Sequence, residues 1–139
     1  MVLNFRYRTL PQSDERKPWD KSKTVKESNM KSIDTEIFPQ ILDSLNNVIV
    51  FVDNDHIIRY VNAAAREKHA KLGDIIGKSI FFCHNENSCR LIKEYYEKMK
   101  NGTDEILVTA HDTYRVVMRS VRSTEGKLMG YYEKIYTVD

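Results

Sequence analysis

The chain has 139 residues, enough for one domain with its own hydrophobic core, and its 41% hydrophobic and 30% charged residues are ordinary for a globular protein. No apolar run approaches the roughly 18 residues of a membrane span, and the arginines near the N-terminus argue against a secretory signal, so we expect a cytoplasmic protein with no membrane partner. Residues 1–31 hold eight Lys/Arg and four Asp/Glu, whereas the remainder holds fourteen and sixteen. Such a weakly acidic body is not typical of a nucleic-acid-binding domain, and we expect no nucleic-acid partner.

Residues 1–31 contain two of the three prolines and show no apolar periodicity. This segment predicts an irregular arm, in which VLNFRYRTL is a candidate extended piece. Residues 32–139 are then expected to form a single domain.

The segment SIDTEIFPQILDSLNN predicts a short amphipathic helix. Its apolar residues recur at helical spacing and are Ile33, Ile37, Ile41, Leu42 and Leu45. Pro39 suggests that the regular helix begins near Phe38, with the proline in its first turn. An apolar stripe of this kind suits packing against a second copy of the chain. The expected homodimer contacts are Ile37, Ile41, Leu42 and Leu45.

The next segment, VIVFVDNDHIIRYVN, predicts a β-hairpin with strands 48–53 and 56–61 around a polar turn. Asn62 is placed to cap a following helix in AAAREKHAKL, and Gly73 is placed to end it. A longer helix is predicted in NSCRLIKEYYEKMKNG, where Glu94 and Lys98 form a favourable i,i+4 pair and Gly102 ends the helix.

The C-terminal part predicts three more strands, in EILVTAH, TYRVVMRSVRS and LMGYYEKIYTV, because apolar and polar residues alternate there. The complete order predicts an α+β fold. It consists of one five-stranded antiparallel sheet with short helices and one longer helix on one face, plus the N-terminal amphipathic helix.

This order and three phrases resemble a PAS domain over about residues 33–139. The phrases are VIVFVDNDHIIRYVNAAA, LGDIIGKSI and YRVVMRSVRSTEGKLMGYYEKI, in which Asn62, Gly77, Gly126, Lys127 and Gly130 fall on the positions of the family pattern. The resemblance implies a sensory module that binds a small molecule or cofactor between the sheet and the long helix. The chain ends at YTVD with no second domain, so we expect a signalling partner in trans.

A finer resemblance involves GKSIFFCHNENSC, which is similar to PAS modules attached to hemerythrin-like domains, where Cys-His-Pro-Pro precedes the long helix. Cys83, His84 and Ser88 match that pattern, whereas Asn85 and Glu86 stand in place of the prolines.

Cys83 and His84 therefore have three open interpretations. One of them could ligate haem iron or another metal, Cys83 could be a redox-responsive thiol together with Cys89, or the loop could simply cap the following helix. Adjacent side chains in an extended segment point to opposite sides, which argues against both facing one metal. The long helix lacks the histidine that oxygen-sensing PAS haem proteins carry, and the cysteine motif of flavin-binding light sensors is missing, which disfavours flavin.

A group of aromatic and sulfur-containing residues, Tyr95, Met99, Met118 and Tyr131, either lines a ligand pocket or fills the core. A ligand-free interaction module that binds partners through the outer face of the sheet is the alternative to a sensor. The volume enclosed by Cys83, Tyr95, Met99 and Met118 should distinguish the two. Since no catalytic set of side chains is evident, we expect no enzymatic activity.

Overall fold

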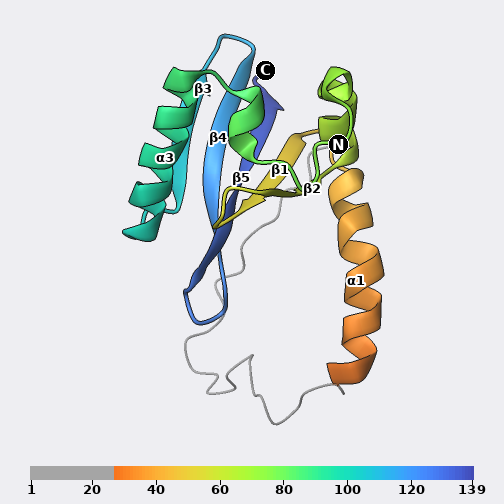
Figure 1. Cartoon of the computed structure of the whole chain (residues 1–139). Helices are drawn as coiled ribbons and strands as arrows, with labels where there is room; N and C mark the ends of the chain where they lie inside the picture. Colours follow the sequence, from red (N-terminus) through yellow and green to blue (C-terminus); the bar gives the residue numbers. More distant parts are fainter. Residues whose placement is uncertain (1–26) are drawn as a thin grey trace. The chain divides into compact units, whose positions relative to one another are not determined.

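The computed structural model describes residues 27–139, with side chains described from Thr35 onward (Figure 1). Residues 36–139 form one compact unit. Most of the expected irregular arm, residues 1–26, lies outside the described residues.

The first helix, α1, spans Glu27–Asp43. The prediction that it begins near Phe38 is wrong, because Pro39 lies inside the helix and not in its first turn. Proline fixes φ near the helical value, so its main cost within a helix is a lost N–H donor and a crowded preceding turn. Residues 35–41 are all exposed.

Five strands form a single antiparallel sheet in the order β2-β1-β5-β4-β3. They are β1 (Val48–Asp53), β2 (Ile58–Val61), β3 (Glu105–Ala110), β4 (Tyr114–Arg122) and β5 (Leu128–Thr137). The predicted sheet is confirmed, except that β2 begins at residue 58. Residues 54–56 form the turn and Ile57 makes an isolated bridge with Ser79, while the Asp53 carboxylate accepts hydrogen bonds from the amides of Asp55 and Ile57 at 2.9 and 3.0 Å.

The helical elements between β2 and β3 are α2 (Ala63–Lys68), the 3-10 helices η2 (Ala70–Leu72) and η3 (Ile80–Cys83), and α3 (Glu86–Lys100). Gly73 follows η2 with φ of 68°, as expected for a terminating glycine. In α3, Lys98 Nζ lies 3.3 Å from Glu94 Oε1, which confirms the predicted pair. Asn85, not the Cys-His pair, caps α3 by accepting a hydrogen bond from the Ser88 amide at 2.8 Å.

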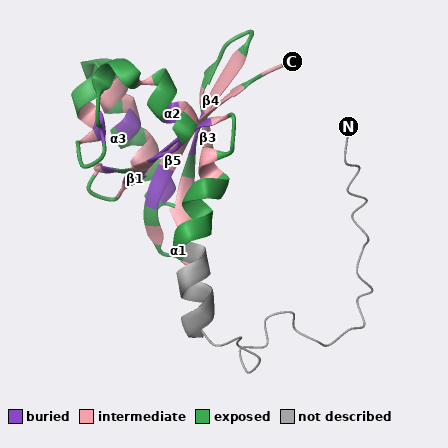
Figure 2. Cartoon of the chain, turned by 90° about the vertical axis from the view of Figure 1, so that its right-hand side faces the viewer, coloured by how far each residue is buried: buried purple, intermediate pink, exposed green. Residues whose placement is uncertain are grey.

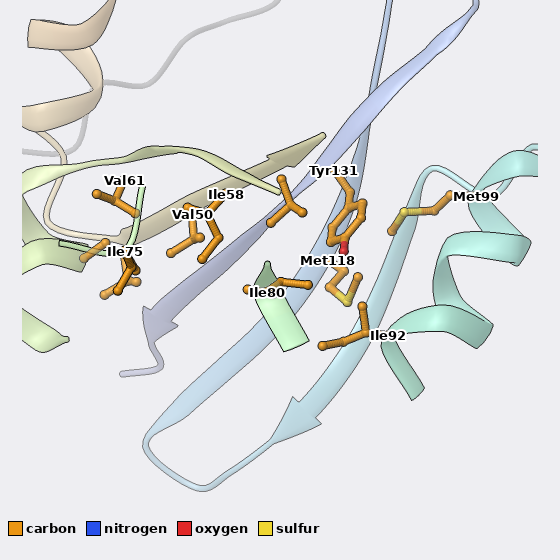
Figure 3. Close-up of a cluster of buried hydrophobic side chains, with 12 residues drawn as sticks. Val50, Ile58, Val61, Ile75, Ile80, Ile92, Met99, Met118 and Tyr131 are labelled. Carbon is orange, nitrogen blue, oxygen red and sulfur yellow. The ribbon is translucent and has the colours of Figure 1, made fainter. Parts of the chain in front are cut away.

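The hydrophobic core lies between one face of the sheet, called here the inner face, and the helices α2, η3 and α3 (Figure 3). Successive side chains of a strand point to opposite faces, so Val48, Val50 and Val52 enter the core while Ile49 and Phe51 belong to the outer face. Figure 2 shows the buried residues gathered in the sheet and these helices, whereas residues 35–41 of α1 are exposed.

Asn62 is fully buried and joins three elements. Its Oδ1 accepts hydrogen bonds from the amides of Ile49 and Ala65, both at 3.0 Å, and its Nδ2 donates to the carbonyls of Leu42 and Asn47 at 3.0 and 2.8 Å. The side chain thus caps α2 as predicted and also fixes the end of α1 to β1. Within the described residues, none of the helices combines the length and apolar character that crossing a membrane requires.

Candidate functional site

Three of the four aromatic and sulfur-containing residues proposed from the sequence are core residues. Met99 is 0% exposed, Met118 3% and Tyr131 2%, and Figure 3 shows the Tyr131 ring directed toward Met118 and α3. Tyr95 is half-buried at the edge of the same cluster, with Lys98 Nζ 5.7 Å from its ring centroid. These side chains pack against one another, so the interior beside α3 is filled.

A small cavity of about 50 Å³ lies elsewhere on the inner face, toward η2 and η3. Its lining residues come from six segments and are Val50, Ile58, His69, Leu72, Ile75, Ile80, Cys83, His84 and Glu133. The proposed ligand group is therefore divided, because Cys83 and His84 line this cavity and the other four residues do not. Pockets for drug-sized molecules measure about 300–1,000 Å³, so this cavity holds only a few atoms.

The side chains of Cys83 and His84 converge. Cys83 Sγ lies 3.3 Å from His84 Nδ1, and both groups approach the Ile80 carbonyl oxygen, at 3.5 and 2.8 Å. The expectation that the two side chains diverge is wrong, because Cys83 ends a 3-10 helix and is not in an extended segment. The Ile80 carbonyl is close to His84 Nδ1, so this nitrogen is already engaged within the protein.

Both cysteines are free thiols. Cys83 is exposed at the surface, but partial desolvation of its thiol raises the pKa, with further contributions from Glu133 and Cys89. Cys89 Sγ lies 3.5 Å from the His84 carbonyl and 3.6 Å from that of Phe81. In the part of the chain that the structure describes, no group of three or more His, Cys, Asp or Glu side chains is arranged to hold a metal ion. Among the described residues, Cys83 and His84 therefore have no further side chains beside them that would complete a metal site.

A larger hollow, of about 620 Å³, lies on the outer face of the sheet beside the end of α1. It is lined mainly by apolar and aromatic side chains, namely Leu42, Leu45, Asn47, Ile49, Phe51, Tyr60, Val121, Tyr132 and Lys134. The strand register places Phe51 between Tyr60 and Tyr132 on neighbouring strands. Two of the predicted dimer contacts, Leu42 and Leu45, belong to this lining. The other two, Ile37 and Ile41, are 46% and 49% exposed.

The hollow is bordered by a polar cluster that attaches the end of α1 to β2 and α2. Asp43 accepts hydrogen bonds from the Tyr60 hydroxyl (2.8 Å), the Ala63 amide (3.0 Å) and the Arg66 guanidinium (3.0 Å). The bonds from Tyr60 and Arg66 lower the pKa of the Asp43 carboxyl. Burial and the bond to Asp43 raise the pKa of Tyr60 to about 12.

Sequence reasoning missed the aromatic residues of this outer face. The signal was present, because Phe51 and Tyr132 alternate with buried residues of β1 and β5 and so make both faces of these strands apolar. A sheet with one solvated face carries mostly polar residues on that side.

The family model described as PAS domain matches residues 38–139, most of the chain. The chain belongs to the PAS domain family. Comparison with curated proteins gave no match. Among solved structures, the PAS domain is similar to a C-terminal domain from Streptococcus mutans (23% identity, TM-score 0.66, covering 76% of this chain and 85% of that one). It is also similar to a PAS domain from Colwellia psychrerythraea (11% identity, TM-score 0.58, 75% and 96%) and to a sensory box sensor histidine kinase from Vibrio cholerae (17% identity, TM-score 0.50, 84% and 99%).

These likenesses confirm the predicted PAS fold. The Cys-His subgroup and its association with hemerythrin-like domains stay predictions.

Proposed function

We propose that this PAS domain is an interaction module, which pairs with a second copy of itself through the outer face of its sheet and the end of α1 and thereby presents a surface to a signalling partner. The observation that carries the proposal is the contrast between the two faces. The inner face is closed by packed side chains around a cavity of about 50 Å³, whereas the outer face carries an apolar hollow of about 620 Å³.

The exposed apolar residues of α1 support a second copy as the occupant. Ile37, Phe38 and Ile41 are 46%, 56% and 49% exposed, and Leu45, which lines the hollow, is 39% exposed. A two-fold interface uses the same patch on both partners, so an apolar ridge that adjoins an apolar hollow is suited to reciprocal packing. Burial of such residues would supply the main driving force at about 25 cal/mol per Å².

Sedimentation velocity over a range of protein concentrations tests the proposal. We expect the wild type to dimerise and Ile41→Asp, which places a charge in the apolar ridge, to weaken the dimer at least tenfold. Ile76→Asp is the matched control, because Ile76 is also 49% exposed but lies outside the ridge and the hollow. A wild type that stays monomeric at all concentrations, or an Ile41→Asp variant that dimerises as tightly as the wild type, would contradict homodimerisation. The remaining form of the interaction-module proposal would then be a monomer that binds a different protein through the same residues.

A second candidate function is small-molecule sensing, the principal prediction from the sequence. Its supporting observation is that polar, titratable groups from His69, Cys83, His84 and Glu133 line the small inner cavity. Enlarging that cavity would require η2 or η3 to move. Native mass spectrometry of freshly purified protein tests this, because a non-covalent adduct that is lost in a cavity-filling Ile75→Phe variant would favour sensing.

Haem does not fit the arrangement described here. The cavity beside Cys83 and His84 is far smaller than a porphyrin, and the Ile80 carbonyl contacts both side chains. We therefore assign no role to haem.

A further inference from the structure

His56, in the turn between β1 and β2, has a left-handed backbone, with φ of 62°. Among the residues that the structure describes, His56 is the single non-glycine residue with a positive φ. The conformation is fixed from both sides, because the His56 amide donates to the Asp53 carbonyl (3.0 Å) and the His56 carbonyl accepts from the Ile80 amide (2.9 Å). Such strained residues persist only where the surrounding structure holds them, and they concentrate at functional positions.

The strained backbone directs the imidazole into a cage of three aromatic rings. The ring centroids of Phe81, Tyr96 and Tyr131 lie 4.9, 4.7 and 5.9 Å from that of His56. These rings come from η3, α3 and the central strand β5. One side chain therefore connects the hairpin turn with the 3-10 helix, the long helix and the centre of the sheet.

A hydrogen bond inside the cage depends on the protonation state of the imidazole. His56 Nδ1 lies 2.9 Å from the hydroxyl of Tyr131, a residue that is only 2% exposed. In the neutral tautomer that carries its proton on Nε2, Nδ1 accepts the hydroxyl proton. An imidazolium carries a proton on both nitrogens, so the Tyr131 O–H would lose its acceptor in a buried place, which is costly.

The charges that face His56 act in both directions. Lys93 of α3 opposes a positive imidazole, whereas Asp53 at the end of β1, Asp55 of the turn and Glu97 of α3 favour it. The hydroxyl-bearing rings of Tyr96 and Tyr131 also contact the imidazole. Phe81 of η3 is uncharged, and Lys93 Nζ lies 5.0 Å from the centroid of its ring. Burial is the dominant influence and lowers the pKa of His56.

We propose that His56 is a pH-sensitive latch, which in its neutral form holds the β1–β2 turn, η3 and α3 against β5 and which releases them when the imidazole is protonated. Release breaks the bond between the His56 carbonyl and the Ile80 amide. Because Ile80, Cys83 and His84 line the inner cavity, movement of η3 opens the interior of the domain. The proposal does not depend on dimerisation.

The sign of the effect follows from the lowered pKa. The open form exposes His56 to water, where its pKa is near 6.5, so the open form binds the proton more tightly than the closed one. Closure is then fully favoured above about pH 6.5 and is lost progressively as the pH falls toward the lowered value. One proton changes the opening equilibrium by at most about tenfold per pH unit.

Hydrogen exchange at pH 7.5 and pH 5.5, corrected for the intrinsic chemistry of exchange, tests the latch. We expect exchange of the His56 and Ile80 amides to accelerate several-fold, up to about tenfold, at the lower pH. Amides in the β4–β5 ladder serve as the internal reference and should change far less, because a general loss of stability would accelerate both sets equally. Equal corrected rates at the two pH values, or parallel acceleration of both sets, would overturn the proposal.

Two variants and a control locate the effect. Asparagine tolerates a left-handed backbone and does not titrate in this range. His56→Asn should therefore remove the acceleration of amide exchange at pH 5.5, called here the pH step. Tyr131→Phe keeps the ring but removes the hydroxyl, so it should reduce the step. His69→Asn is the matched control, since burial also lowers the pKa of His69, and should retain it. A step that persists in His56→Asn would overturn the latch. Should that variant not fold, NMR titration of His56 in the wild type decides, because a midpoint at or above 6.5 would overturn it as well.

Discussion

Asp43, the last residue of α1, accepts a hydrogen bond from Tyr60 on the edge strand β2, with 2.8 Å between Oδ1 and the hydroxyl oxygen. Together with the bonds from Arg66 and the Ala63 amide, this contact joins the end of α1 to β2 and α2, beside the bonds that Asn62 and Tyr60 donate to the Leu42 and Pro39 carbonyls. Because α1 carries the exposed apolar ridge, the same carboxylate also sets the position of the proposed dimer contacts.

The attachment predicts a dependence on acid. The bonds from Tyr60 and Arg66 lower the Asp43 pKa, so their contribution to stability is present above the ordinary aspartate value near 4 and is lost as the pH falls through the lowered value. We expect Asp43→Asn to lower the urea midpoint at pH 7 and to lose less stability than the wild type between pH 5 and pH 2. Urea titrations at several pH values measure both effects. Glu67→Gln, at an exposed position of α2, is the control and should leave the midpoint at pH 7 nearly unchanged.

The two asparagine N-caps should differ in their energetic weight. Asn62 is fully buried and makes four side-chain hydrogen bonds, whereas Asn85 is exposed and makes one to the Ser88 amide. Loss of an exposed cap costs about 1 kcal/mol, and unsatisfied buried partners add about 1–3 kcal/mol. We therefore expect Asn62→Ala to lower the free energy of unfolding by about 3 kcal/mol and Asn85→Ala by about 1 kcal/mol. Equal losses in chemical denaturation would show that Asn62 acts only as a local cap.

The same two residues illustrate what the sequence could predict. Asn62 was predicted as a cap because it precedes an alanine-rich helix, which is a local signal. Its bonds to Leu42 and Asn47 depend on how α1 packs, and no local pattern encodes them. Asn85 was interpreted only as a departure from the Cys-His-Pro-Pro pattern, although an asparagine before a helix is itself a capping signal.

The alternation of apolar residues was enough to predict the sheet. It could not predict which part of the interior is filled by side chains and which part is a cavity. Periodicity places Met118 and Tyr131 on the inner face, yet only the packing of α3 decides whether the space between them is empty or filled. The convergence of Cys83 and His84 was likewise missed, because it requires the 3-10 helix that ends at Cys83.

Two turn-region glycines differ in the space around them. A Cβ on Gly130, where φ is 149°, would collide with the carbonyl oxygen of Val52 and come within 3.0 Å of the Asp53 Cα. Gly126 has φ of 85° but no atom near a Cβ, so only backbone strain of about 1–2 kcal/mol opposes a side chain there. We expect Gly130→Ala to cost at least about 4 kcal/mol or to prevent folding, and Gly126→Ala to cost about 1–2 kcal/mol. Thermal unfolding of both variants provides the comparison, and a Gly130→Ala variant as stable as Gly126→Ala would contradict the close approach of β5 to β1.

Cys83 should react slowly as a nucleophile. Although the residue is exposed, partial desolvation of the thiol raises its pKa, and the thiolate is the reactive form. In a Cys89→Ser background, we expect alkylation of Cys83 by iodoacetamide at pH 7.5 to be several-fold slower in the folded protein than in the same protein unfolded in urea. A folded-state rate that exceeds the unfolded one would instead support the redox interpretation of this thiol.

The packing of Met118 provides a direct test of the filled interior. Met118 is 3% exposed in the core, whereas Met129 is 52% exposed, so the two methionines form a matched pair. Truncation of a packed core methionine typically costs about 2–5 kcal/mol, part of which comes from the cavity left behind. We expect Met118→Ala to lower the free energy of unfolding by about 3 kcal/mol and Met129→Ala by less than about 0.5 kcal/mol. If the space beside Met118 were an open ligand pocket, few atoms would contact the side chain and its removal would cost about 1 kcal/mol or less. A small loss for Met118→Ala would therefore favour small-molecule sensing over the interaction module, and the expected large loss would favour the reverse.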